Sequence, residues 1–293
     1  MSALAERTVT TGHDAAAVAD EPRTLTAYER LEALCDPGSL HVIRSTVLPQ
    51  RESKRVKPGD GVVGAAGTVA GRPVYCYAQD QTFVGGSLGE AHADTIVRVM
   101  QLAGRAGVPV IGFIASGGAR MDDGIAALGG YGRIFRESVR LSGKVPQISI
   151  ITGVSAGGGA YSPALTDFVV MTEQSAMFLT GPGVVKEVMG EDVDAVELGG
   201  PRVHSKNGVC QFVAEDDVDA TRLARDLLAH LPQKAGNDLP HGGPAMVPSV
   251  DPSTFVPESQ RSVYDVRDVI RAVVDDGAIL EMSERWARNM VTG

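Results

Sequence analysis

Two stretches of the sequence decide the fold: PVIGFIASGGAR at 109–120 and PQISIITGVSAGGGA at 146–160. The first begins with a short apolar run, PVIGFIA, which is typical of a strand buried on both faces of a sheet, and the second begins with the next expected buried strand, PQISIITG. A glycine-rich turn follows each run, and a helix is expected after each turn, the first over 122–142. Repetition of strand, turn and helix predicts β-α-β crossovers and a mainly parallel sheet, and therefore an α/β fold.

Further helices and strands are expected on both sides of these stretches. Apolar residues recur at helical spacing in 25–35, 90–106 and 217–231, which predicts three more helices. The other expected elements are short strands in the glycine-broken segment 61–87, two strands within 168–181 and a helix over 184–190.

The distribution of proline divides the chain into segments. We expect a disordered polar leader at 1–24, one domain at 25–231 and a proline-rich linker at 232–261. Residues 262–293 then read as a helix, a DDG turn and a short strand. About thirty residues are too few for a second hydrophobic core, so this segment is expected to be the truncated start of a further domain.

The overall composition excludes several classes of protein. Lys and Arg total 27 against 36 Asp and Glu, and the resulting net charge of −9 argues against a nucleic-acid binder. No signal peptide or stretch of ~18 apolar residues is visible, so no membrane partner is expected. Cys35, Cys76 and Cys210 form no CxxC pair, which predicts no metal site and favours reduced thiols in a cytoplasmic protein.

The two glycine-rich turns are the best candidates for an active site. Gly117 and Gly118 lie in the first, and Gly157 and Gly158 in the second. Glycine lets a ligand approach the backbone closely, and N–H groups at the start of a helix are free to donate. Tight packing alone would explain either turn, but the two together favour an oxyanion site with these four glycines as catalytic residues.

The sequence places no acid–base residue beside these turns. The six histidines are scattered, none lies in either turn, and a lone histidine here is expected at the surface. Ser155 and Ser162 flank the second turn, but neither has the His–Asp pattern of a nucleophilic serine. Such a site suits a reaction in which the substrate or a cofactor moves the protons.

A short basic run at 51–57 supplies the candidate cofactor-binding residues. Arg51, Lys54 and Arg55 could meet phosphates, with Ala119 of the first turn as a further contact. The competing interpretation of such a run is solvated surface.

Four long segments resemble the biotin-dependent acyl-CoA carboxyltransferases, in particular the β subunits of propionyl-CoA and related acyl-CoA carboxylases. They begin GDGVVGAAG at 59, SGGARMDDG at 116, VPQISIITG at 145 and FLTGPGVVK at 178. The resemblance runs in order from about residue 25 to the end. It implies a crotonase-like (ClpP/crotonase) β-β-α superhelix for this α/β chain.

The resemblance also implies a reaction and its participants. Acyl-CoA would be bound with its thioester carbonyl at the two glycine turns, and its enolate would take a carboxyl group from carboxybiotin on a partner carrier protein. The implied partners are a biotin carboxylase or biotin carrier subunit and a complementary carboxyl-terminal half, because 262–293 would be the truncated start of that half. A homo- or hetero-oligomer is expected.

Departures from the family pattern keep other functions open. Ala115 stands where members commonly have Asp before SGGAR. The alternative enzyme is a free-standing decarboxylase of malonyl-type thioesters or another crotonase-like CoA-thioester enzyme, since loss of CO2 makes the same enolate. A scaffold protein that kept the fold is the non-enzymatic alternative. A Clp-type peptidase is disfavoured, because Gly157 stands at the place of its nucleophile.

Overall fold

A computed structural model describes residues 24–49, 55–240, 250–259 and 261–293. Apart from its last residue, the expected leader at 1–24 lies outside the described residues, as do parts of the expected linker. No helix in the described ranges is both long and apolar enough to cross a membrane.

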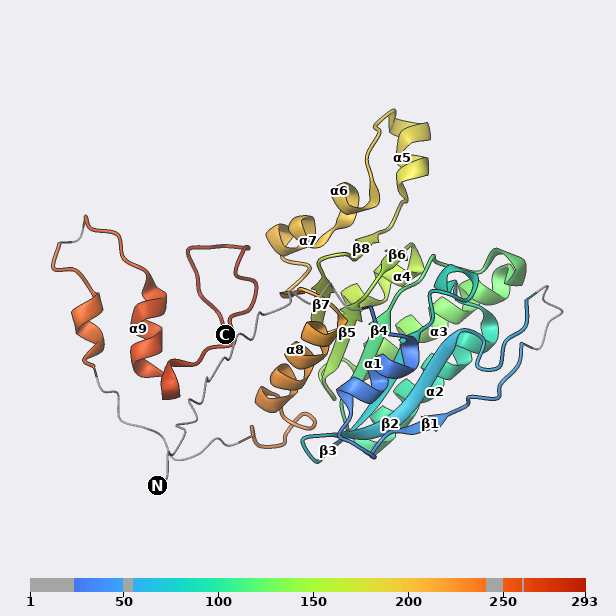
Figure 1. Ribbon diagram of the computed structural model, residues 1–293, viewed down its shortest axis with the longest axis horizontal. Helices are drawn as coiled ribbons and strands as arrows, with labels where there is room; N and C mark the ends of the chain where they lie inside the picture. The colour runs from blue at the N-terminus through green and yellow to red at the C-terminus, as the bar shows by residue number, and fades with distance from the viewer. Residues whose placement is uncertain (1–23, 50–54, 241–249, 260) are drawn as a thin grey trace, which may run out of the picture.

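Seven strands of the described chain form one sheet, in the order β1-β2-β3-β4-β5-β7-β9 (Figure 1). The three strands on one side are antiparallel, whereas each neighbouring pair from β3 to β9 is parallel. The mainly parallel sheet expected from the two decisive stretches is therefore confirmed. The strands are β1 His41–Ile43, β2 Val62–Val69, β3 Arg72–Gln79, β4 Val110–Ile114, β5 Gln147–Ile151, β7 Phe168–Thr172 and β9 Phe212–Ala214.

Helices cover both faces of this sheet (Figure 1). On one face, α2 (Glu90–Ala106) and α3 (Ile125–Leu141) bury Ile96, Met100 and Ile134 against the sheet. On the other, α1 (Ala27–Leu34) and α8 (Asp217–His230) bury residues such as Leu31 and Leu227. Alternate residues of β4 and β5 face the two cores in turn, which is why both strands are buried along their whole length.

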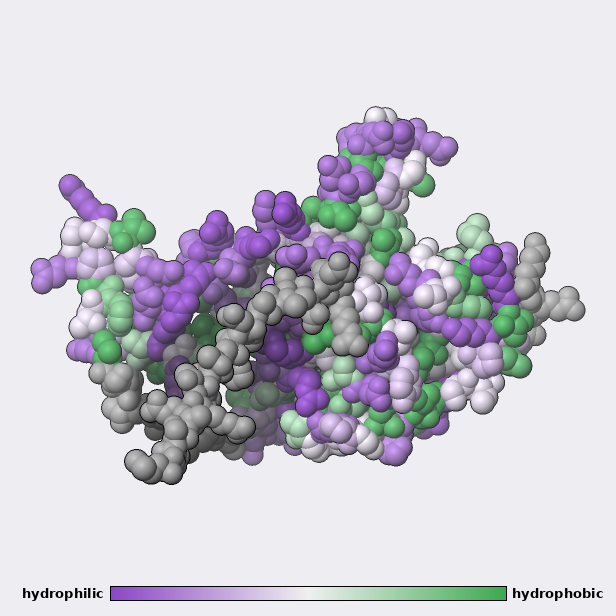
Figure 2. Space-filling view, viewed as in Figure 1, coloured by the Kyte–Doolittle hydropathy of each residue, from purple (hydrophilic) through white to green (hydrophobic). Residues whose placement is uncertain are grey.

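A smaller parallel pair, β6 (Val154–Ala156) and β8 (Ala176–Phe178), lies beside the main sheet. After β8 the chain forms an arm that carries hydrophobic residues interspersed among hydrophilic ones (Figures 1 and 2). The strands expected within 168–181 and the helix expected over 184–190 are confirmed as β7, β8 and α5. The helices of this region are α4 Gly158–Tyr161, α5 Pro182–Met189, α6 Ala195–Gly199 and α7 Pro201–Asn207.

The carboxyl-terminal segment contains the expected helix and turn but not the expected strand. The helix is α9 (Val266–Val273), and a short 3-10 helix follows at Asp275–Gly277. The segment beyond it makes only one isolated bridge, between Met282 and Thr292. A strand needs a continuous hydrogen-bonded partner, and among the described residues none lies along this segment.

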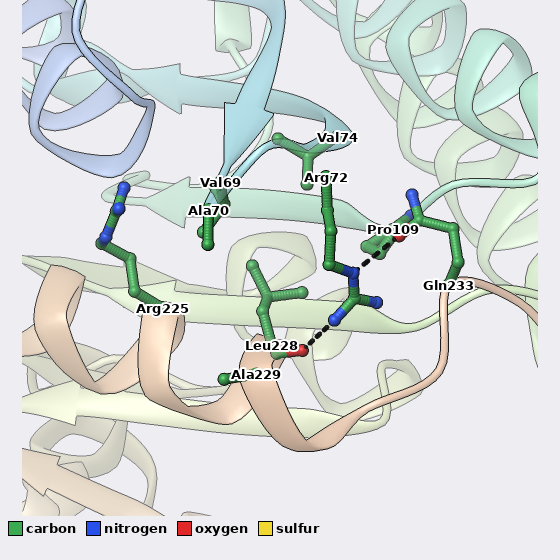
Figure 3. A pocket seen from close by; sticks show the side chains of 9 residues that line it. All are labelled: Val69, Ala70, Arg72, Val74, Pro109, Arg225, Leu228, Ala229 and Gln233. Carbon is green, nitrogen blue, oxygen red and sulfur yellow. Dashed lines mark hydrogen bonds between the residues drawn. The ribbon is translucent and has the colours of Figure 1, made fainter. Parts of the chain in front are cut away.

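Arg72, the first residue of β3, holds the end of α8 (Figure 3). Its guanidinium donates to the carbonyl oxygens of Leu228 (2.5 Å) and Leu231 (2.8 Å) and to the side chain of Gln233 (3.0 Å). The last carbonyls of a helix lack partners within the helix, and a cation there is favourable. Arg72 therefore fixes α8 to the start of β3.

We expect Arg72→Ala to lower the free energy of unfolding by about 1–3 kcal/mol, because the helix carbonyls lose charged hydrogen bonds. Urea denaturation measures the change. The matched control is Arg98→Ala on the exposed face of α2, expected to stay within about 0.5 kcal/mol of the wild type. Equal effects of the two substitutions would show that Arg72 is not an anchor.

Candidate active site

The two glycine-rich turns lie side by side. The first follows β4 and the second follows β5 and includes the end of β6, where the N–H of Ala156 donates to the carbonyl of Ser116 in the first turn at 2.8 Å. A Cβ atom on Gly159 would lie 3.1 Å from that same carbonyl oxygen. Backbone therefore packs directly on backbone, which is possible because the small residues of each turn leave room for the other.

Two of the four predicted glycine donors are used to hold the turns in place. The N–H of Gly117 donates to the carbonyl of Gly85 at 2.9 Å, and that of Gly157 donates to the carbonyl of Phe178 at 3.0 Å. The N–H of Gly118 makes a long bond of 3.3 Å to the hydroxyl of Ser116. The N–H groups of Gly117 and Gly157 therefore hold the two turns in position and are not free to donate to a ligand.

The N–H groups of Ala119, Gly158 and Gly159 have no acceptor among the described residues. Gly159 is buried, whereas Ala119 and Gly158 are partly exposed. One accessible donor thus comes from each turn. Of the residues predicted from the sequence, Gly158, expected to be catalytic, and Ala119, expected to bind a cofactor, are therefore the two that combine an unused N–H with partial exposure.

Glycine is required at two positions of the second turn for different reasons. Gly157 has φ 54° and ψ −118°, a conformation that residues with a side chain rarely adopt. Gly158 has an ordinary helical backbone, but a Cβ there would lie 2.7 Å from the ring of Tyr131. The first glycine permits the turn, and the second lets Tyr131 pack beneath it.

A buried ion pair, which the sequence did not reveal, anchors the first turn. The guanidinium of Arg120 donates to the carboxylate of Asp60 at 2.5 Å and to the carbonyl of Ser87 at 3.0 Å. Asp60 is fully buried and Arg120 is only 3% exposed. The other carboxylate oxygen accepts from the backbone N–H of His92 at 3.0 Å. Because the paired residues lie 60 positions apart, no local spacing indicates their contact.

His92 corrects the expectation that a lone histidine lies at the surface. Its side chain is fully buried, with one ring nitrogen 3.1 Å from the amide nitrogen of Gln79. Burial, with the nearby charge of Arg120, lowers the pKa of His92 to about 3. The ring is therefore neutral at pH 7 and does not serve as an acid there.

Neither serine of the second turn has a base beside it. Ser155 and Ser162 are both buried. The hydroxyl of Ser155 has no hydrogen-bond partner in the described ranges. That the site lacks a nucleophilic serine stays a prediction.

The predicted basic contacts are only partly described. Arg51 and Lys54 lie outside the described residues, and Arg55 is exposed. The ammonium of Lys57, in the same run, pairs with the carboxylate of Asp80 at 2.5 Å. The role of Arg51, Lys54 and Arg55 in binding phosphate stays a prediction.

An apolar cavity of about 370 Å³ lies beside the second turn. Its volume falls within the range of small-molecule sites. The ring nitrogen of His204 bonds the carbonyl of Met177 at 2.6 Å and so closes one side. The lining residues are Ala160, Tyr161, Ala164, Leu165, Met177, Phe178, Leu179, His204 and Val209. No group of three or more metal-ligating side chains occurs in the part of the chain that the structure describes.

Residues 21–293 match the family described as the carboxyl transferase domain. The chain is 46% identical to the methylmalonyl-CoA carboxyltransferase 12S subunit of Propionibacterium freudenreichii subsp. shermanii, over 91% of this chain and 52% of that protein. It is 43% identical to the methylmalonyl-CoA decarboxylase subunit alpha of Veillonella parvula, over 92% and 54% of the two chains. The chain therefore spans about half the length of the curated relatives it matches.

Solved structures give the same relationship. The crystal structure of transcarboxylase 12S, a hexamer with methylmalonyl-CoA and methylmalonic acid bound, superposes with a TM-score of 0.89 at 46% identity. The alignment covers 91% of this chain and 54% of that one. A single-chain long-chain acyl-CoA carboxylase gives a TM-score of 0.78 at 28% identity, over 91% of this chain and 27% of that one. The predicted crotonase-like fold is confirmed.

We expect Arg120→Met to lower the free energy of unfolding by about 3–5 kcal/mol, because it leaves the carboxylate of Asp60 buried without its cation. Chemical denaturation measures the loss. The double variant Asp60→Asn with Arg120→Met should lose less than the sum of the two single variants, because the pair is coupled.

The control for this prediction is the exposed pair of Lys186 and Asp192. Lys186→Ala should cost no more than about 1 kcal/mol. Additive losses in the Asp60 and Arg120 double variant would contradict the role given to the pair.

Proposed function

The chain belongs to the carboxyl transferase domain family, and on this premise we propose that it is a carboxyltransferase subunit of a biotin-dependent acyl-CoA carboxylase. The observation that carries the proposal is the pair of adjoining turns, each with one accessible N–H donor, at Ala119 and Gly158. Such a pair suits a thioester whose carbonyl oxygen gains negative charge during the reaction.

The chain's own contribution to the reaction is stabilisation of charge. The N–H groups of Ala119 and Gly158 would donate to thioester oxygens as the acyl group becomes an enolate. Both turns are held by bonds to Gly85, Phe178 and each other, so the donors are already in place before the substrate binds. Donors fixed in advance cost no reorganisation in the transition state, and one is worth about 10²–10³ in rate.

We propose that the cavity beside the second turn receives the biotin group that the family implies. It is apolar, it has the volume of a small-molecule site, and its lining residues Ala160 and Tyr161 closely follow Gly158. Biotin carried by a partner supplies the carboxyl group when it is bound. Arg51, Lys54 and Arg55 remain the proposed contacts for the phosphates of CoA, by charge-assisted hydrogen bonds.

We propose further that the active enzyme contains more than this chain. Met121 and Ile125, which follow the first turn directly, are 90% and 81% exposed. Exposed apolar side chains beside an active site suit a surface covered by another subunit. The proposed partners are a complementary carboxyl-terminal carboxyltransferase half, a biotin carrier with its carboxylase, and further copies in an oligomer. The three free cysteines support a cytoplasmic location.

Decarboxylation is the second candidate function. The relative from Veillonella parvula is named a methylmalonyl-CoA decarboxylase subunit. Loss of CO2 from a malonyl-type thioester yields the same enolate, so the donors at Ala119 and Gly158 would serve that reaction equally well. The two functions differ in the fate of the carboxyl group and not in the demands made on this chain.

We expect the purified chain to bind propionyl-CoA saturably in calorimetric titration, with affinity that falls as salt is raised, because CoA phosphates are screened. Carboxyl transfer from free carboxybiotin should require addition of a complementary carboxyl-terminal half. Release of CO2 from methylmalonyl-CoA by the unsupplemented chain would instead favour the decarboxylase. Failure of a folded sample to bind any acyl-CoA would overturn both functions.

We expect Gly158→Pro to lower kcat/KM at least ~100-fold relative to Gly158→Ala in the active complex. Both substitutions add a Cβ against Tyr131, but only proline removes the N–H. Proline is tolerated at the first position of a helix, where Gly158 lies, so α4 should persist. Circular dichroism checks the fold. Equal activities of the two variants would exclude this N–H as an oxyanion donor.

A further inference from the structure

Cys35 occupies a gap in the sheet surface that a glycine leaves. Gly67 lies on β2, and a Cβ built on it would come within 2.5 Å of the Sγ atom of Cys35. Cys35 is the residue that ends α1, and it is 4% exposed. Its sulfur therefore sits directly on the sheet, held there by the contacts of α1.

Cys76 lies next to this position on the neighbouring strand. In the pairing of β3 with β2, Cys76 lies opposite Ala65. Ala65 is two residues from Gly67 and points to the same face of β2. Cys76 is fully buried, and it belongs to the same apolar cluster as Cys35. The Cys76 side chain is therefore diagonal to Gly67, on the face of the sheet that the Cys35 sulfur covers. Two cysteines at neighbouring positions of one buried face are placed to form a disulfide, in which the sulfurs lie about 2.05 Å apart.

The environments of the two thiols differ in a way that assigns their roles. The hydrogen bond from Cys76 lowers the pKa of Cys35 below that of an ordinary thiol, against the opposing effect of burial. The same bond, with burial, raises the pKa of Cys76. The thiolate is the reactive form, and Cys35 is also the less buried thiol, at 4% exposure against 0% for Cys76, so Cys35 is the attacking residue. Cys35 also adjoins the exposed turn at Pro37 and Gly38, which gives a small oxidant a route in.

We propose that Cys35 and Cys76 form a redox pair, in which a small peroxide oxidises Cys35 and Cys76 then closes a disulfide. The Cys35 sulfur attacks one peroxide oxygen, the O–O bond breaks, and the leaving hydroxide takes a proton to become water. The Cys76 sulfur then attacks the sulfenic acid, the S–O bond breaks, and a second water leaves with the Cys76 proton. Sulfur is oxidised and the peroxide is reduced.

The disulfide would join α1 covalently to β3 and enclose β1 and β2 in a ring. In the reduced protein, no cross-link joins α1 to the sheet. The buried ion pair between Arg30 of α1 and Asp217 of α8, at 2.9 Å, is one of the contacts that hold the helix in place. Closing a ring of this size restricts the unfolded chain and stabilises the fold. The pair lies apart from the glycine turns, so this inference does not rest on the proposed function.

The test treats the purified full chain with hydrogen peroxide, blocks remaining thiols under denaturing conditions and maps the peptides without reduction. We expect a peptide that links Cys35 to Cys76, free Cys210, and a Tm raised on the order of 10 °C that dithiothreitol reverses. Absence of the linked peptide would overturn the redox pair. A linked peptide without a rise in Tm would overturn the covalent anchoring of α1.

Two variants sharpen the experiment. Cys210→Ser is the matched control, because Cys210 is equally buried and its thiol bonds the carbonyl of Phe212 at 3.0 Å; it should keep the linked peptide. Cys76→Ser should lose the link and accumulate sulfinic acid at Cys35, since no resolving thiol remains. If the wild type accumulates as much sulfinic acid as Cys76→Ser, Cys76 does not resolve the oxidised Cys35.

Discussion

The ion pair between Arg120 and Asp60 is the contact on which the rest of the site depends. A charged pair with almost no exposure is costly to bury, and further hydrogen bonds to its charged groups offset part of that cost. Here Asp60 also accepts from His92 at the start of α2, and Arg120 also donates to Ser87. The first glycine turn is thereby tied to α2, and the second takes its position from the first through Ala156 and Ser116.

This hierarchy explains why the site contains so many glycines and so few charged groups. The backbone N–H groups of Gly117 and Gly157 form hydrogen bonds within the protein that hold the turns in place. Those of Ala119 and Gly158 have no acceptor among the described residues and can donate to a ligand. A site made of fixed backbone dipoles can stabilise an oxyanion without a titrating residue. The neutral, buried His92 fits the same design, because its lowered pKa keeps a further charge away from the turns.

Carboxyl transfer and decarboxylation, the two proposed functions, place the same demand on the glycine turns of this chain. Relatives named for each reaction align with the chain at 46% and 43% identity over nearly its whole length. Both reactions pass through a thioester enolate, so the two donors suit either. For the proposed function, the direction in which the carboxyl group moves would then depend on what binds beside the turns, where the apolar cavity lies.

The sequence alone determined the local structure: two buried strands, the glycine turns after them and the main helices, because apolar periodicity and turn chemistry act over a few residues. Its long resemblance to a known family also indicated the fold. Only the tertiary structure decided which N–H groups are free, that Asp60 meets Arg120, that His92 is buried, and that no strand forms near residue 282. Each of these depends on a partner far away in the chain, such as Gly85 for Gly117 or Phe178 for Gly157. Such distant partners determine which hydrogen bonds form and which side chains are buried. The sequence around each residue does not indicate which residue its distant partner is.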